Sequence, residues 1–365
     1  MNISAAQTEY YRRPADERYA SPESLVQFSQ ARKAACREVS YNAKDLRILP
    51  IADNGTIGRV QLASPKGVAE LTPWSHGQLC RMVGAPAAYI RSLPATVAAD
   101  ALNYGLRTTA AGSTAVILGQ LGDAGVTARA ITSESYGRLY DADLLAPIVN
   151  TLGQHGWTTP PTWDGTPGGA YASDRDSFLL LCKGGSIVND PSVRSGNGQM
   201  YRALMVRNSE VGAAAAVIQR VLYQFVCGNH MLWGAIIDKT YRRRHVGSKV
   251  LRDVLREVGT IARTWIDRPA SADETIIRHL LDTEVAHTRE ACIDELMAMG
   301  ATRVQATEAY ATCEQSFDAS PRSFWGLSQG LTRSSQTAGY QDQRLEMDQL
   351  AAALLRKGTR SLVAA

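Results

Sequence analysis

Four residues that could form a nucleophilic centre lie in one part of the chain: Cys227, Asn229, His230 and His245. A cysteine nucleophile needs a base and an orienting group within hydrogen-bond reach, and histidine and asparagine can supply these roles. Cys227, however, ends the apolar run 221–226, where a cysteine is more often a small core residue than a reactive thiolate. A Cys227-dependent enzyme using His230 or His245 therefore stays open as an alternative, and we assign no catalytic residue.

Metal and nucleotide motifs give weaker signals. His279 and His287 are eight residues apart, with Asp282 and Glu284 between them. This pattern lacks the HxxxH or HExxH spacing of metal-binding helices, so a solvated helix face is the expectation and no metal is predicted. The glycines of 119–125 are spaced GxxGxxG and fall in an expected hairpin turn, unlike those of a dinucleotide fold. Because the sequence has no GxxxxGK[ST] loop, we predict no nucleotide hydrolysis, and no cofactor is predicted.

Positive charge is concentrated in one stretch of the chain. The formal net charge is +4, yet residues 219–264 alone hold nine basic and three acidic residues. Tyr241 precedes three consecutive arginines there, and this combination suits single-stranded nucleic acid, because guanidinium groups neutralise phosphates while flat groups stack on exposed bases. The alternative is that these arginines lie at the solvent-exposed start of a helix and pair with acidic residues of the C-terminal helices. The predicted nucleic-acid-binding residues are Arg202, Arg207, Arg220, Lys239, Tyr241, Arg242, Arg243, Arg244 and Lys249.

The elements that must position these residues are short strands and short helices up to about residue 247. Alternating and apolar runs predict strands at 39–41, 46–51, 57–62, 114–131 and 178–182. Proline-marked starts and helical spacing predict helices at 72–83, 87–93, 95–105 and 143–153. The block 205–245 is expected to form a strand, a turn at 208–212 and a second, apolar strand that ends at Cys227.

From Ser248 onward the sequence is almost wholly helical in pattern, with periodic stretches over 248–266, 272–299, 301–315 and 338–357. Residues 1–35 are polar and rich in tyrosine and arginine, which predicts a flexible basic and aromatic arm. The predicted fold class is α+β. Antiparallel strands with short helices form a core over 36–247, and a helical C-terminal region over 248–365 packs on that core.

The composition is that of a globular protein, with 45% hydrophobic and 20% charged residues. None of the six cysteines belongs to a CxxC pair, which favours buried free thiols in a reducing compartment. The first residues lack the apolar segment of a secretory signal, and no apolar run approaches the roughly 20 residues of a membrane span. We therefore expect a cytoplasmic protein that does not associate with membranes.

One combination of motifs resembles a known family. An NSxxG turn at 208–212 is followed by an apolar strand that ends in CxN at 227–229, and His245 follows later. These features, with further similarity at 79–94, 130–139 and 324–332, resemble the bacterial, phage and plasmid family catalogued as domain of unknown function 932. Gln329 and Gly330 stand where that family has Asn-Ala. The resemblance covers about residues 40–355 and implies a protein of a mobile element, a class that often includes recombination or anti-defence proteins.

Charge and resemblance together predict a protein that binds single-stranded DNA. We expect a strand-annealing or recombination protein of a phage or plasmid, which acts as a homo-oligomer and without nucleotide hydrolysis. Annealing requires a basic groove that holds the backbone and leaves the base edges free. The alternatives are the Cys/His-dependent enzyme and a non-catalytic interaction protein with an anti-defence or regulatory role.

Overall fold

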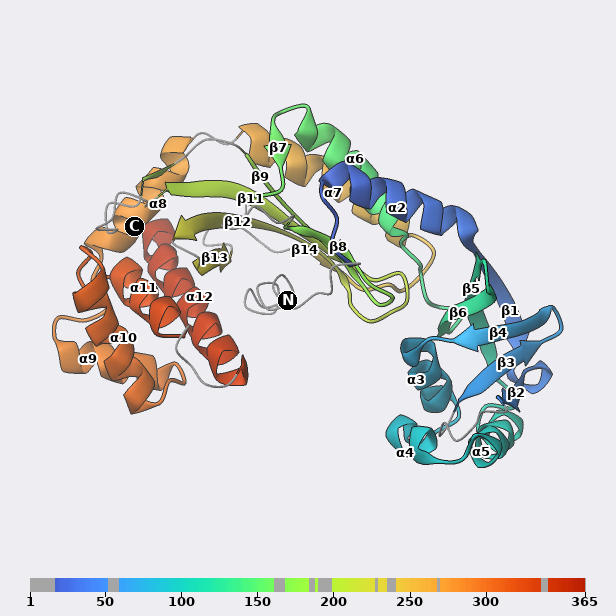
Figure 1. Cartoon of the computed structure of the whole chain (residues 1–365). Coiled ribbons are helices and arrows are strands. Elements are labelled where there is room, and N and C mark those ends of the chain that lie inside the picture. Colours follow the sequence, from blue (N-terminus) through green and yellow to red (C-terminus); the bar gives the residue numbers. More distant parts are fainter. Residues whose placement is uncertain are drawn as a thin grey trace.

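The computed structural model describes residues 17–51, 59–160, 168–183, 188–189, 199–226, 229–234, 241–267, 270–335 and 341–364. Within these ranges the strands lie in the first two thirds of the chain and the helices predominate towards the C-terminus (Figure 1). The predicted α+β class is therefore confirmed.

The first sheet has the strand order β1-β5-β6-β4-β3-β2, and its neighbours are antiparallel except for β4 and β6. Helices α3, α4 and α5 cover one face, where Leu62, Leu102 and Ile117 belong to one buried cluster. The strands are β1 (Cys36–Asn42), β2 (Arg47–Pro50), β3 (Val60–Ser64), β4 (Gly67–Leu71), β5 (Thr114–Gly122) and β6 (Gly125–Thr132). The helices are α3 (Pro73–Met82), α4 (Ala87–Ser92) and α5 (Ala95–Arg107), and a 3₁₀ turn, η2, spans Ala43–Asp45.

The second sheet follows the order β13-β12-β11-β9-β7, with β8, β10 and β14 paired to β9, β11 and β12. Successive residues of a strand point to opposite faces. Leu204 and Val206 of β11 thus join one buried cluster, while Met205 joins another. The strands are β7 (Trp157–Thr158), β8 (Ala170–Ala172), β9 (Ser177–Lys183), β10 (Val188–Asn189), β11 (Gln199–Asn208), β12 (Ala216–Val226), β13 (Asn229–Gly234) and β14 (Tyr241–Arg243).

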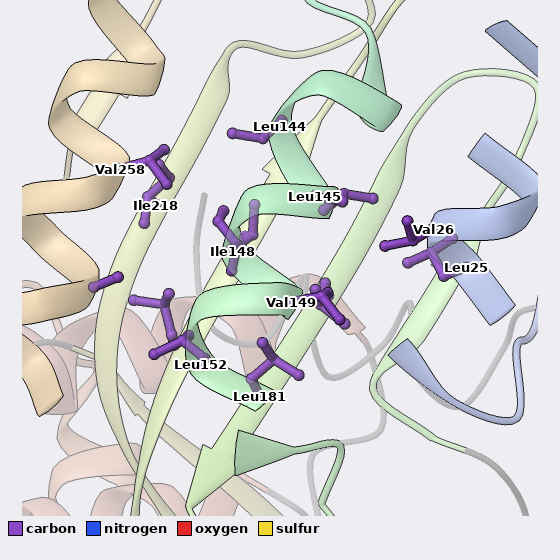
Figure 2. Close-up of a cluster of buried hydrophobic side chains, with 14 of the residues drawn as sticks. Leu25, Val26, Leu144, Leu145, Ile148, Val149, Leu152, Leu181, Ile218 and Val258 are labelled. Carbon is purple, nitrogen blue, oxygen red and sulfur yellow. The ribbon is translucent and has the colours of Figure 1, made fainter. Parts of the chain in front are cut away.

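Three helices cover one face of this second sheet: α2 (Pro22–Ala35), α6 (Asp141–Gly153) and α7 (Val250–Asp267). Figure 2 shows their buried side chains, with α6 between the other two and with Ile148 and Leu152 above the strands. Contacts join α2 to α6 and α6 to α7, so the three helices form one layer. This layer positions the candidate site described below.

Helix α2 differs from the prediction, which placed residues 1–35 in a flexible arm. Ser21 caps the helix through a reciprocal capping box with Ser24, and Pro22 stands in its first turn. Leu25 and Val26 anchor it in the core. The polar composition of the segment concealed these two apolar contacts and the cap. Residues 1–16 of the predicted arm lie outside the described residues.

The C-terminal region is helical, as expected, and its helices surround a buried cluster that includes Trp325. The predicted continuous helix over 272–299 is wrong: α8 ends at Asp282, and α9 starts after Thr288, whose side chain caps it. The helices are α8 (Ala270–Asp282), α9 (Arg289–Ala298), α10 (Arg303–Ser316), α11 (Phe324–Ser335) and α12 (Gln341–Ala364). Among the helices of the described residues, none has the length and apolarity needed to cross a membrane.

The cysteines of the described residues are all buried and have no disulfide partner, as the sequence predicted: Cys36, Cys80, Cys182, Cys292 and Cys313. Cys227 lies outside the described residues. Burial raises the pKa of Cys182 to about 12, and it also raises the pKa of Cys80. Since the thiolate is the reactive form, these two thiols are poor nucleophiles.

Candidate nucleic-acid interface

Helix α7 carries a row of arginines on its outer face. Arg252, Arg256 and Arg263 are exposed, and the side chains of the first two are 72% and 75% accessible. At 3.6 residues per turn, their positions fall within about 40° of one another around the helix axis. Lys249, which is also exposed, precedes the helix. The α7 stripe, as we call Lys249, Arg252, Arg256 and Arg263, is therefore a continuous row of positive charge.

Two acidic residues of α7 are turned away from this row. Asp253 and Glu257 lie about 100° and 140° around the axis from Arg252, beyond the α7 stripe. Asp253 forms an ion pair with Arg243 at 3.1 Å. Its distance from Arg252 is longer, at 3.8 Å. Glu257 lies 3.8 Å from Arg256 in an equally exposed contact. Exposed pairs of this kind are weak, so the guanidinium groups of the stripe can exchange them for phosphates.

An open groove runs beside the stripe, between α2 and α7 and above α6. Its volume is about 820 Å³, which is in the range of ligand sites, roughly 300–1,000 Å³. Leu251 and Leu255 form the α7 wall, and they lie on the side of the helix next to the arginines. Lys33 and Arg37, at the end of α2 and the start of β1, line the opposite wall.

The depth of this groove follows from the sequence of α6. The outer face of α6 presents Ala142, Ala146 and Pro147, which are short, while the neighbouring helices present long side chains. Alanine at consecutive turns of the middle helix leaves a depression between two taller walls. Asp143 is the acidic residue of the lining, and Lys33 neutralises it at 2.6 Å.

A buried cluster of charges fixes α2 against α6. Arg32 of α2 donates to the carboxylate of Asp141, the first residue of α6, at 2.6 Å, and to the carbonyl of Ser173 at 2.8 Å. Arg32 also lies 3.5 Å from Glu210, which forms an ion pair with Arg129 at 2.6 Å. Glu210 further accepts the backbone N–H of Asp141 at 3.0 Å. All four charged side chains are nearly inaccessible to solvent.

The turn at 208–212 is the centre of this cluster and joins the two sheets. Asn208 donates to Asp141 at 2.7 Å and to the carbonyl of Leu139 at 2.8 Å. Trp74 and Gln78 of α3 both donate to the carbonyl of Val211, at 2.9 and 2.7 Å. The NSxxG turn therefore connects the first sheet and its helices to the second sheet.

Asp141 gives the cluster a dependence on pH. Burial and the neighbouring Glu210 raise the pKa of Asp141 to about 6, against the effect of Arg32. Burial also favours a higher pKa for Glu210, but the charges of Arg32 and Arg129 outweigh burial and lower the pKa of Glu210. Asp141 is therefore the carboxyl group of the pair that takes up a proton first as the pH falls.

We expect Asp141→Asn to change the pH dependence of stability. Because the pKa of Asp141 is higher in the folded than in the unfolded state, its contribution to the free energy of unfolding falls as the pH rises from about 4 to about 6. The free energy of unfolding of the variant does not contain this pH-dependent decrease. As the pH rises from about 4 to about 6, the stability of the variant relative to wild type should therefore increase. Urea denaturation at several pH values measures the difference; a difference that stays constant with pH would contradict the assignment.

The structure separates the predicted run Tyr241–Arg244. In β14, Tyr241 and Arg243 pair with Ile218 and Ala216 of β12, on the face that packs against α7. Tyr241 is half-buried there, and Arg243 is paired with Asp253. Arg242 lies on the opposite face of the sheet, and Arg244 follows the strand; both are exposed. The four side chains thus do not form a single surface.

The other predicted residues are also dispersed. Arg202 is buried, and Arg207 pairs with Asp176 at 2.7 Å on the far face of the sheet. Arg220 reaches Thr264 of α7 at 3.5 Å, and Lys239 lies outside the described residues. Lys249 remains exposed at the start of α7 and belongs to the stripe.

The residues of the alternative catalytic centre are only partly described. His245 is buried, stacks on Tyr136 at 5.3 Å, and has its Nδ1 atom 3.3 Å from the carbonyl of Gly137. Burial lowers the pKa of His245. His230 lies in β13, and Cys227 is outside the described residues. In the described part of the chain, no group of three or more His, Cys, Asp or Glu residues is placed to hold a metal.

Sequence reasoning missed the two walls of the groove. The basic stretch 219–264 includes Arg252, Arg256 and Arg263, and their spacing of four and seven residues indicates that they share one face of a helix. Lys33 and Arg37 lie more than 200 residues earlier in the chain. Their proximity to α7 depends on the packing of α2 on α6, which no local pattern reveals.

Comparisons of the chain with models of protein families, with curated proteins and with solved structures found no match. The resemblance to the family of domain of unknown function 932 therefore stays a prediction.

Proposed function

We propose that this protein binds single-stranded DNA through the α7 stripe. The α7 stripe supports the proposal because four cations lie on one exposed surface, where the contacts of Arg252 with Asp253 and of Arg256 with Glu257 are long and exposed. Phosphate contacts of this kind supply most of the affinity of non-specific nucleic-acid binding. The proposal keeps the predicted partner but moves the contact surface from Tyr241–Arg244 to α7.

The proposal also includes the predicted role in strand annealing and the predicted self-association of the protein. Strand annealing in recombination, for a phage or plasmid, needs a protein that holds the backbone without consuming nucleotides. Self-association would extend a short basic row into a longer track along a strand. The α7 stripe spans about 16 Å from Arg252 to Arg263, since a helix rises 1.5 Å per residue. Several subunits would therefore be needed to hold a long single strand.

A mobility-shift experiment tests the proposal. The purified protein is titrated against a labelled oligonucleotide of roughly 30 nucleotides, which exceeds the usual site size of a single-strand-binding domain. At low salt we expect a shifted complex that an excess of heparin, a competing polyanion, dissociates. If no complex forms at micromolar protein concentration, the proposed function is wrong.

A further inference from the structure

The groove between α2, α6 and α7 has an apolar floor and one strongly cationic edge. Ala146 and Pro147 of α6 lie at the floor, and Leu255 of α7, which is 37% exposed, stands at the wall. One edge carries Arg37 and the ion pair of Lys33 with Asp143, in which the two charges cancel. The other edge is the α7 stripe, because Arg252 and Arg256 follow Leu251 and Leu255 by one residue each, or about 100° around the helix.

Such a surface fits a ligand with flat apolar groups and an anionic backbone along one side of them. In a single strand, the bases are unpaired and can present their faces to the protein, while the one phosphate backbone runs along their side. In a duplex, the bases are stacked inside, so that only phosphates could reach the cationic side chains. The apolar floor therefore distinguishes single strands from duplexes, whereas the cations do not.

We infer that this groove receives the unstacked bases of a single-stranded nucleic acid whose phosphates lie on the α7 stripe. The inference rests on the proposed function and adds to it the place of the bases and the origin of a preference for single strands. The groove is built by the packing of α2 and α7 on either side of α6, and the ion pair of Arg32 with Asp141 holds one of its walls in place.

The test compares binding of a single strand with binding of a duplex of the same length and sequence. Ala146→Phe places a ring in the groove, and Leu255→Ser removes the apolar wall without adding bulk. Ala101→Phe is the matched control, because Ala101 is exposed in the middle of α5, outside the groove. Circular dichroism confirms that the variants are folded, and fluorescence anisotropy gives the dissociation constants.

For wild-type protein and the control variant, we expect single strands to bind about ten-fold more tightly than the duplex. Ala146→Phe should weaken single-strand binding about ten-fold and leave duplex binding unchanged, and Leu255→Ser should have the same selective effect, about three-fold. If both groove variants bind the single strand as wild type does, the inference is wrong even though the proposed function stands. Binding of neither DNA form by wild type would instead overturn the proposed function, and the inference with it.

Two other occupants of the groove give distinct results. Light scattering detects a change in the mass of the Ala146→Phe variant. If that mass falls while DNA binding is retained, the groove holds a second copy of this chain. If poly-glutamate binds wild type but not the variant, and DNA binding is again retained, the groove holds an acidic protein segment. Either result would overturn the inference.

Discussion

Replacing Glu210 by alanine is expected to destabilise the protein by about 3–5 kcal/mol. Glu210 accepts from Arg129 at 2.6 Å and lies 3.5 Å from Arg32, and both guanidinium groups are buried. Removal of the carboxylate leaves their charge without this partner in a region of low dielectric constant, which costs far more than an exposed ion pair is worth. The backbone N–H of Asp141 also loses its acceptor.

Urea denaturation followed by tryptophan fluorescence measures this loss. Glu210→Gln is the graded variant: its amide oxygen still accepts hydrogen bonds but carries no charge, so we expect a smaller loss. Glu308→Ala, at an exposed position of α10, is the control and should change stability by less than about 0.5 kcal/mol. A loss below about 1 kcal/mol for Glu210→Ala would mean that the buried cluster does not hold α2, α6 and the two sheets together.

The second large effect concerns the α7 stripe. The triple variant Arg252→Ala, Arg256→Ala and Arg263→Ala removes three positive charges from one exposed face, and we expect it to weaken single-strand binding about 100-fold at low salt. Stability should change little, because the three side chains are exposed and their ion pairs are weak. The expected loss is therefore one of affinity alone.

A second triple variant separates local from overall charge. Arg278, Arg356 and Arg360 are exposed on α8 and α12, and their replacement by alanine lowers the net charge by the same amount. This control should bind single strands within about two-fold of wild type. Equal losses of affinity in the two triple variants would show that binding follows the net charge of the protein and that α7 is not the contact surface.

Local patterns predicted the helices α3, α4 and α5 almost to the residue. Pro73 and Pro94 mark the first and third starts, and Thr72 caps α3 by accepting from the backbone of Ser75. The same reasoning failed for α2, whose stability depends on the contact of Leu25 and Val26 with a distant helix and sheet. Its capping box at Ser21 was the local signal, and the polar composition of the segment concealed it.

The candidate site was predicted in part. The charge count identified the stretch of chain that contains the α7 stripe, but it did not show that Tyr241–Arg243 form strand β14, in which successive side chains point to opposite faces. Strand register is a non-local property, and a shift of one residue exchanges the two faces. The pairing of Arg207 with Asp176 and the burial of Arg202 are likewise tertiary contacts. The periodicity of α7, in contrast, could have been recognised from the sequence.

The most direct test of the central proposal is the salt dependence of single-strand binding, measured by fluorescence anisotropy with a labelled oligonucleotide. Each phosphate contact with a single strand contributes about −0.7 to the slope of the logarithm of the association constant against the logarithm of the salt concentration. Four contacts from the α7 stripe give an expected slope of about −3 for wild type, and of about −1 for the triple variant of α7. Binding that is absent at low salt, or that has the same slope in both proteins, would contradict the account.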